Sequence, residues 1–575
     1  MNTLFSKLTD ILIGLWIEKG RNRVINFSAI TIFMLICSFL TMGKSAQAAE
    51  KVYASYSAFE RSISVQALED FAKKGLIDDD LAVYQQYIPT SQLQQLRRVL
   101  LNPIKINSVA ISQFLYSPQG ETLLKRLGEV IRSDSRQSEA SFYALRSSLI
   151  LAASEPGGIT LLNILQKYPT PGIRIDLAGA AGIAGELEKF VSETNKAVAA
   201  VNQKANTEAA IIESPENISQ LPDFRKSGKF GARKYGLQLY DAVRGRLLLT
   251  DVYLPKIFQN SPVIVISHGT GSDSSNFEYL ATHLASYGFA VVVPNHPGSD
   301  AKQIESLLKG SATEVAEPGD FKDRPLDVKY ILDELEQLNH KDSRFKDRLN
   351  LQQVGVIGQS FGGYTALALG GAKLNFEQLN KDCQSNILKN SWNLSLLLQC
   401  RALELENIQD GKEYNFYDER VKAVIALNPI TSSVFGEEGL KGIQVPVMIV
   451  AGSDDTIAPA IYEQIIPFAS IPYTQKYLAV LEGATHFSLI GESKGGSSQF
   501  ILPANVVGDD PSLARKYVKM MSIPFLETYV SGKEIYTNQL NAAYGKAISS
   551  PNLKFSLIQS LTTTELAKSF DGELP

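Results

Sequence analysis

The sequence predicts an α/β fold, in which a mostly parallel sheet of eight strands carries helices on both faces and follows a small all-helical domain. Short apolar runs rich in β-branched residues recur from residue 234 onward, and apolar helical stretches separate them. The residues before them show helical periodicity instead. A chain of 575 residues is also too long for one core, so at least two domains are expected.

The N-terminus has the composition of an export signal. Basic residues between positions 19 and 23 precede an apolar run over 24–42, and Ala46 and Ala48 supply the small-x-small pattern that a signal peptidase requires. We expect residues 1–48 to be a signal peptide, with the mature chain in the periplasm, a lumen or the extracellular space. An uncleaved membrane anchor is the alternative, because the apolar run is borderline in length for a spanning helix.

The composition excludes several classes of protein. Hydrophobic residues make up 44% and charged residues 20%, which is typical of a globular chain. The formal net charge of −4 argues against nucleic acid as a partner, since that partner needs clustered positive charge. The sequence has no Cys/His cluster with zinc spacing and no glycine-rich phosphate loop after the first strand, so no metal or other cofactor is predicted.

Residues 49–201 are predicted to form the helical domain. Ser64 can cap one helix that ends at Gly75, and Ser117 with the following proline can start another. The block contains no histidine and no cysteine, so we interpret it as an accessory or interaction domain whose partner the sequence does not identify. Residues 202–233 are predicted to be a linker, because most of this stretch is polar and charged and contains prolines.

Residues 234–575 are predicted to form the α/β domain. Its first two strands should form a hairpin, and six short apolar strands should follow. The predicted strands are 235–241, 246–254, 262–267, 289–294, 354–357, 421–427, 445–451 and 477–481.

Ser360 is the candidate nucleophile. It lies in Gly-Gln-Ser-Phe-Gly, directly after the predicted strand 354–357 and before a helix-forming stretch. A strand, a sharp turn and a helix are the context that a Gly-x-Ser-x-Gly nucleophile requires. Gly358 and Gly362 lack a Cβ atom, so the helix can start close to the strand.

A nucleophilic serine needs a base and an acid that orients the base. The expected chain order is nucleophile, acid, histidine, and His486 is the only histidine after Ser360. The acid should follow the strand 445–451, where Asp454 and Asp455 compete. The spacing Gly-x-x-Asp-x-x-x-Pro favours Asp455, and Asp454 is interpreted as a turn residue.

The oxyanion of an acyl-transfer intermediate needs preorganised N–H donors. The backbone amide of Phe361, the residue after the nucleophile, is one candidate. Thr270 is the other, because the loop Ser-His-Gly-Thr-Gly follows the third strand. In this interpretation His268 orders the loop, whereas His296 either lines the substrate cleft or holds a loop.

Residues 371–417 form a longer connection than a simple strand crossover needs, and we interpret them as a cap over the site. They contain Cys383 and Cys400, which would pair as a disulfide in an exported protein, although two buried free thiols are the alternative. The leucines of this insertion favour an acyl or lipid-like substrate, and the alternative is that they form part of the core, as buried leucines more often do. A second insertion, 491–510, follows His486 and is expected to form another wall of the site.

At these motifs the sequence resembles a known family. Residues 234–570 resemble the α/β-hydrolase superfamily. The stretches "ISHGTGSDSSNFEYLATHLASYGFAVVVPNHPGS" and "GQSFGG" are similar to the branch of platelet-activating-factor acetylhydrolases and predicted dienelactone-hydrolase-like esterases. The helical block resembles an uncharacterised domain that precedes such hydrolases in cyanobacteria. Acetylhydrolases proper take their acid from the end of the strand after the nucleophile, where this chain has Asn428, so their substrate does not transfer.

These observations predict an exported serine carboxylic-ester hydrolase of esterase or lipase type, with an acyl-enzyme intermediate on Ser360. The expected partner is a small-molecule or lipid ester, with peripheral contact to a membrane in the lipid case. A serine hydrolase of a thioester or peptide bond is the nearest alternative, because the same triad serves all three bonds. A non-catalytic binding or scaffold protein is the alternative from another class.

Overall fold

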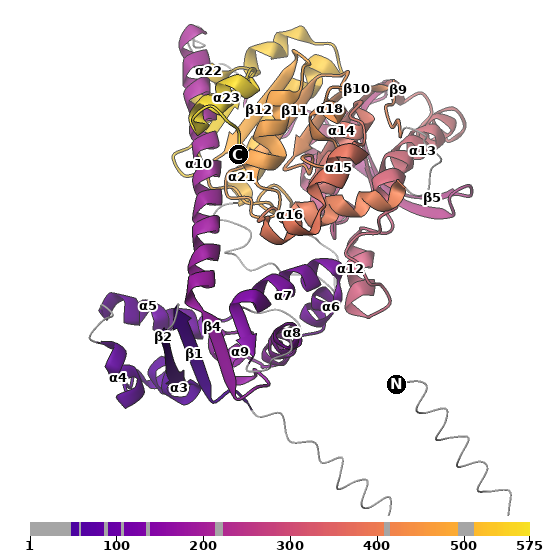
Figure 1. Ribbon diagram of the computed structural model, residues 1–575. Coiled ribbons are helices and arrows are strands. Elements are labelled where there is room, and N and C mark those ends of the chain that lie inside the picture. The colour runs from indigo at the N-terminus through magenta and orange to yellow at the C-terminus, as the bar shows by residue number, and fades with distance from the viewer. Residues whose placement is uncertain are drawn as a thin grey trace, which may run out of the picture.

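The computed structural model describes residues 48–56, 59–85, 90–104, 108–133, 139–212, 222–406, 414–492 and 511–575. These residues form an N-terminal domain, a long connecting helix and a larger domain built on a nine-stranded sheet (Figure 1). The predicted leader lies outside the described residues except for Ala48. No helix within the described ranges combines the length and the apolar character that crossing a bilayer requires.

The N-terminal domain is not all-helical, and that prediction was wrong. It contains a four-stranded sheet in the order β2-β1-β4-β3. Its strands are β1 (Lys51–Tyr56), β2 (Phe59–Ser64), β3 (Ile131–Ser133) and β4 (Gly172–Asp176). Val52 of β1 pairs with Ile63 of β2 and with Ile173 of β4, and these apolar residues pack against the helices. Serine and charged residues interrupt the alternation along these short strands, so their period-2 pattern is weak.

Side-chain caps and a C-terminal glycine set several of the helix ends in this domain. Ser64 Oγ accepts the Ala67 N–H at 3.1 Å, and Gly75 ends the same helix with φ 73°, which confirms both predicted ends. Ser117 accepts the Gly120 N–H at 3.2 Å. The helices are α3 (Val65–Lys74), α4 (Asp79–Gln85), α5 (Thr90–Leu101), α6 (Ser108–Tyr116), α7 (Pro118–Val130), α8 (Ala140–Ala153) and α9 (Leu161–Gln166).

Helix α10 (Leu177–Ile211) joins the two domains (Figure 1). The prediction that the linker begins at 202 was wrong, since the helix continues for a further ten residues, to 211. Burial explains the continuation, because Ala197, Val201 and Ala205 pack into the core of the larger domain. A helix end that is polar in sequence is therefore stabilised by tertiary packing.

The large sheet confirms the predicted mostly parallel arrangement. Its strands, in spatial order, are β13 (Phe555–Ile558), β12 (Lys476–Leu481), β11 (Val447–Gly452), β10 (Val421–Leu427), β9 (Leu349–Gln359), β7 (Ser261–Ser267), β8 (Ala290–Pro294), β6 (Arg246–Pro255) and β5 (Ala232–Asp241). The pairings from β8 through β12 are parallel, and β5 and β6 form the expected antiparallel hairpin. The sheet has nine strands and not eight, because the short β13 adds an antiparallel edge beside β12.

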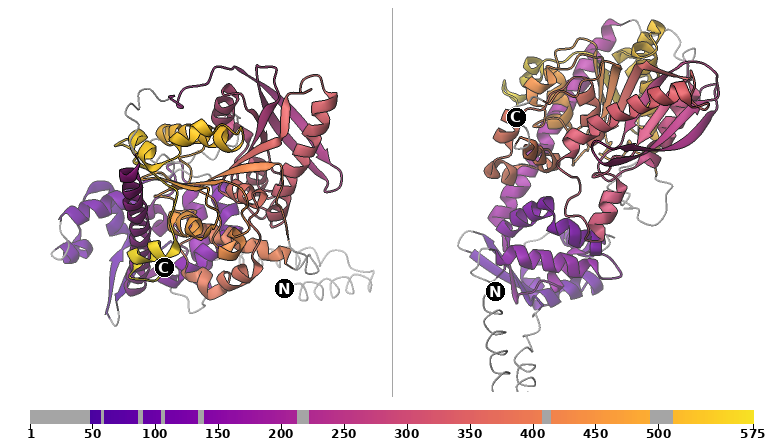
Figure 2. Two further views of the ribbon diagram at one scale, coloured as in Figure 1. Left: turned by 90° about the horizontal axis from the view of Figure 1, so that it is seen from above. Right: turned by 90° about the vertical axis from the view of Figure 1, so that its right-hand side faces the viewer.

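Helices cover both faces of this sheet (Figure 2). Neighbouring residues of one strand, such as Val356 and Ile357 of β9, face different cores. Helices α10, α13 and α14 contribute to one core, and α11 and α21 contribute to the other. The helices outside the 371–417 insertion are α11 (Glu278–Ser286), α12 (Ala301–Leu308), α13 (Asp320–Lys341), α14 (Phe361–Leu369), α18 (Gly436–Leu440), α19 (Ile466–Ser470), α21 (Pro511–Tyr529), α22 (Ala542–Ile548) and α23 (Thr563–Ala567).

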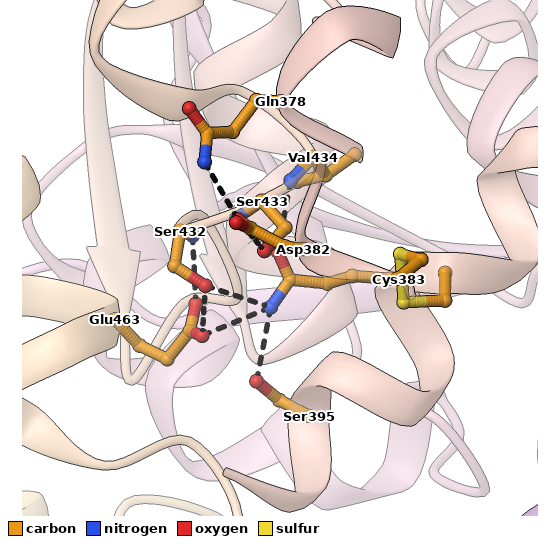
Figure 3. The surroundings of a disulfide bond; sticks show 10 residues. Gln378, Asp382, Cys383, Ser395, Ser432, Ser433, Val434 and Glu463 are labelled. Carbon is orange, nitrogen blue, oxygen red and sulfur yellow. Dashed lines mark hydrogen bonds between the residues drawn. A yellow bond between two sulfur atoms is a disulfide. The ribbon is translucent and has the colours of Figure 1, made fainter. Parts of the chain in front are cut away.

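The insertion 371–417, described up to residue 406 and from 414, folds into short helices. They are α15 (Phe376–Asp382), α16 (Ser385–Asn390), α17 (Leu394–Gln399) and η3 (Cys400–Leu405). Gln399 anchors them: its Nε2 donates to Ser395 Oγ at 3.1 Å and to Glu463 Oε1 at 2.9 Å (Figure 3). Its Oε1 accepts the Ser433 and Val434 amides at 2.9 Å. The insertion is thus fixed to the loop after β10. Of the second insertion, only residues 491 and 492 are described.

A disulfide joins Cys383 at the end of α15 to Cys400, with 5.6 Å between the Cα atoms (Figure 3). Replacing both cysteines with serine should lower the free energy of unfolding by about 3 kcal/mol, because the bridge closes a short loop in the unfolded chain. Urea unfolding of both oxidised proteins measures the difference. A reductant should destabilise the wild type and leave the double-serine variant unchanged, and equal stabilities of the two oxidised proteins would contradict the prediction.

The N-terminal domain contacts the insertion through Arg126 of α7. The guanidinium donates to the Ser391 carbonyl at 2.7 Å, and its carbon lies 3.8 Å from the centroid of the Trp392 ring. The same side chain pairs with Glu186 of α10 at 2.8 Å. Helix α6 also packs against α12 of the larger domain. The two domains are therefore joined by side-chain contacts as well as by α10.

Candidate active site

Ser360 sits on the sharp turn between β9 and α14. Its φ of 56° is in the left-handed region, which costs a residue with a side chain about 1–3 kcal/mol and is typical of a nucleophile turn. The two motif glycines allow the close approach. A Cβ on Gly358 would lie 1.8 Å from the Gly362 carbonyl oxygen, and one on Gly362 would lie 2.0 Å from the Ser267 carbonyl oxygen. The glycine–serine–glycine spacing is thus required by packing.

The structure brings Ser360, His486 and Asp455 together in a hydrogen-bonded line. His486 Nε2 lies 2.9 Å from Ser360 Oγ, and His486 Nδ1 lies 2.6 Å from Asp455 Oδ2. A carboxylate can only accept, so the Nδ1–H donates to Asp455 and Nε2 accepts from the serine hydroxyl. All three residues are buried, and Ser360 is 7% exposed. In this arrangement the imidazole can take the hydroxyl proton.

The two neighbouring aspartates have different surroundings. Asp455 Oδ1 accepts the backbone amides of Ile457 and Ala458 at 2.9 and 2.8 Å, which leaves Oδ2 for the histidine. Asp454 is exposed and accepts from the Ser453 hydroxyl at 2.6 Å. The geometry therefore brings Asp455, and not Asp454, to His486.

Two side-chain amides that were not predicted as site residues, those of Gln359 and Asn428, hold the histidine loop. Gln359 Nε2 donates to the His486 carbonyl at 3.2 Å. Asn428 Nδ2 donates to the Thr485 carbonyl at 3.2 Å, and its Oδ1 accepts the Gly452 amide at 2.9 Å. Asn428 therefore links the base loop to the end of β11, a function that a carboxylate, which has no N–H, cannot perform. Its place after β10 was the available signal.

The loop after β7 lies beside the nucleophile. A Cβ on Gly269 would be 3.2 Å from Ser360 Cβ and 2.2 Å from Gln359 Oε1, so a side chain at this position would displace the Gln359 amide. Thr270, the next residue, continues the loop, and Phe361 begins α14 with its ring fully buried. The two residues predicted to bind an oxyanion therefore come from the two segments that meet at Ser360.

Beneath this loop lies a second Ser–His–Asp line, which is fully buried. His296 Nε2 lies 3.0 Å from Ser267 Oγ, and His296 Nδ1 lies 3.1 Å from Asp327 Oδ2. All three residues are 0% exposed. The His296 amide donates to His268 Nε2 at 3.0 Å, so both histidines hold the loop. Of the two roles considered for His296, the structure supports the structural one.

Burial keeps both of these histidines neutral near pH 7. Burial and the charge of Arg324 lower the pKa of His296 to about 4, and the same causes hold the pKa of His268 well below its usual value. Burial opposes ionisation of Asp327, but hydrogen bonds from His296 and Arg246 outweigh it and lower the pKa of this carboxyl. Neutral His296 therefore donates a hydrogen bond from Nδ1 to the Asp327 carboxylate, and its Nε2 accepts a hydrogen bond from the Ser267 hydroxyl.

Arg324 and Asp327 were missed as site residues. Both lie on α13 within a buried stripe that includes Phe321, Val328 and Ile331. Charged residues on the apolar stripe of an amphipathic helix indicate a buried polar network, and this signal was present in the sequence. Among the described residues, no cluster of three or more histidine, cysteine or acidic side chains has the arrangement of a metal site.

Two family models match the chain. The model described as alpha/beta hydrolase of unknown function (DUF1400) matches residues 48–176, which end at β4 of the N-terminal domain. The model described as alpha/beta hydrolase fold matches residues 262–395, which include Thr270 and Ser360 but end before Asp455 and His486. A search of curated proteins found no match to the chain.

Proposed function

The chain belongs to the α/β-hydrolase superfamily, and we propose that it is a serine hydrolase that cleaves carboxylic esters. One observation carries the proposal. The hydrogen-bonded line from Ser360 through His486 to Asp455 joins three residues from the carboxyl ends of β9, β12 and β11, where the catalytic groups of an α/β hydrolase are expected.

In the proposed reaction, His486 Nε2 takes the proton of Ser360 Oγ as the oxygen attacks the ester carbonyl. Asp455 keeps the imidazole oriented and stabilises the imidazolium. The backbone amides of Phe361 and Thr270 bind the oxyanion. His486 then gives its proton to the leaving alcohol, and an acyl-enzyme remains on Ser360. Water activated by the same histidine releases the carboxylic acid.

Export is part of the proposal. The Cys383–Cys400 disulfide favours an oxidising compartment, in agreement with the signal-like N-terminus. We propose an ester with an acyl or lipid-like chain as the substrate, because the insertion that follows the nucleophile helix is rich in leucine.

A fluorophosphonate probe and an acyl-substrate panel test this function on the oxidised mature chain. We expect one label, on Ser360, and turnover of p-nitrophenyl esters with a preferred chain length. Thioesters and peptides of matched acyl groups form the comparison arms. Faster turnover of the thioester or the peptide would mean that this bond, and not the ester, is the substrate. The absence of both labelling and acyl hydrolysis would mean that the protein is non-catalytic.

A further inference from the structure

Arg324 is a fully buried cation beneath the loop that carries Thr270. Its Nη1 donates to the His268 carbonyl at 2.8 Å, and its Nε donates to Ser299 Oγ at 2.9 Å. The Ser299 carbonyl in turn accepts the Gly271 amide at 2.8 Å. The guanidinium is therefore connected to the loop on both sides of Thr270, directly at His268 and through Ser299 at Gly271.

The same guanidinium contacts the other side of the site. Its carbon lies 4.6 Å from the centroid of the Phe361 ring, which is within cation–π distance. Phe321, one turn before Arg324 on α13, packs its ring 4.6 Å from that of Phe361. Helix α13 thus contacts both segments. Its Phe321 and Arg324 pack against the ring of Phe361, and Arg324 also binds the loop that carries Thr270.

The donors of Arg324 are directed at this loop and not at a carboxylate. Within the described ranges, no carboxylate oxygen lies within 4.0 Å of its guanidinium nitrogens, and the nearby Asp327 is bound by Arg244 and Arg246 at 2.8 Å. Burial lowers the pKa of Arg324 to about 10, so the side chain stays cationic at neutral pH. Burial of this cation is costly, and the carboxylates of Asp320, Asp327 and Asp300 offset part of the cost at longer range.

We propose that Arg324 is a positioning residue that sets the distance between the two oxyanion donors, the amides of Thr270 and Phe361. The inference rests on the proposed serine hydrolase function. It gives Arg324 no contact with substrate. Arg324 aligns two segments, the loop that follows β7 and the helix start that follows β9.

Arg324→Gln and Arg324→Lys test the role. We expect Arg324→Gln to lower kcat by ~10- to 100-fold, which is no more than the loss of one oxyanion donor causes. KM should change by no more than about 3-fold. The lysine variant keeps the charge but cannot reach both His268 and Ser299, so it should recover only part of kcat. A trifluoromethyl ketone with the preferred acyl chain forms a tetrahedral oxyanion on Ser360. The affinity of the variant for this ketone should fall by the same factor as kcat/KM. Its affinity for the matched alkane, which forms no oxyanion, should not change.

Controls separate this role from folding. Arg348 also donates to two backbone carbonyls, of Pro255 and Ile257, but lies before the opposite end of β9, so Arg348→Lys should keep wild-type kcat and inhibitor affinity. Ser299→Ala removes one acceptor of Arg324 and should give a smaller loss in the same direction, and it carries the test if the Arg324 variants do not fold. A folded Arg324→Gln, or Ser299→Ala, with wild-type kcat and inhibitor affinity would overturn the proposal. A wild-type chain that hydrolyses no ester would instead refute the proposed function.

Discussion

Replacing Ser360 with alanine should abolish ester turnover, with a fall in kcat on the order of 10⁶-fold. The variant loses the hydroxyl oxygen that lies 2.9 Å from His486 Nε2 in the line to Asp455. Alanine is smaller than serine and Ser360 is 7% exposed, so the turn should keep its structure. Initial rates on p-nitrophenyl esters and unfolding curves of both proteins, measured together, separate loss of chemistry from loss of fold.

The buried line from Ser267 to Asp327 provides an internal control for this prediction. Its hydrogen bonds join the same kinds of atom as those of the candidate site, at 3.0 and 3.1 Å, yet Ser267 is 0% exposed. Hydrogen-bond geometry alone would make both serines nucleophiles, whereas access to substrate selects Ser360. The Ser360→Ala variant should therefore show no fluorophosphonate label. A label that persists and maps to Ser267 would contradict the assignment.

The residues of the candidate site were predictable because they follow buried parallel strands. Such strands appear as short apolar β-branched runs, and β10 occupies the predicted residues, Val421–Leu427. A nucleophile, an acid and a base at the ends of three of these runs must lie at one edge of the sheet. Sequence order then selects His486, and the spacing after β11 selects Asp455 over its neighbour.

Other features depend on contacts between distant residues and leave a weak local pattern. Strands β1 and β4 are 121 residues apart at Val52 and Ile173 and pair in parallel, so neither has a hairpin signal. Arg324 is a charged residue on an apolar stripe, and only the folded chain shows that its partners are His268 and Ser299. Tertiary packing, which the sequence pattern does not report, decides both cases.

Asp455→Asn should lower kcat by ~10⁴-fold with little change in fold, because it reverses the direction of one hydrogen bond. Asp455 Oδ1 accepts the Ile457 and Ala458 amides, so an asparagine carbonyl oxygen would keep this place and its NH₂ group would face His486 Nδ1. The imidazole would then have to accept at Nδ1 and carry its proton on Nε2. That tautomer cannot take a proton from Ser360.

Asp454→Asn is the matched control, because it makes the same chemical change one residue earlier on an exposed side chain. Its kcat should stay within about 2-fold of wild type, since an exposed charge is screened by solvent. Equal losses in the two variants would mean that the negative charge of the loop, and not the hydrogen bond to Nδ1, supports catalysis. A larger loss at Asp454 would require the acid to be reassigned. Asn428 cannot replace Asp455 in either case, because its own amide is committed to the Thr485 carbonyl and the Gly452 N–H.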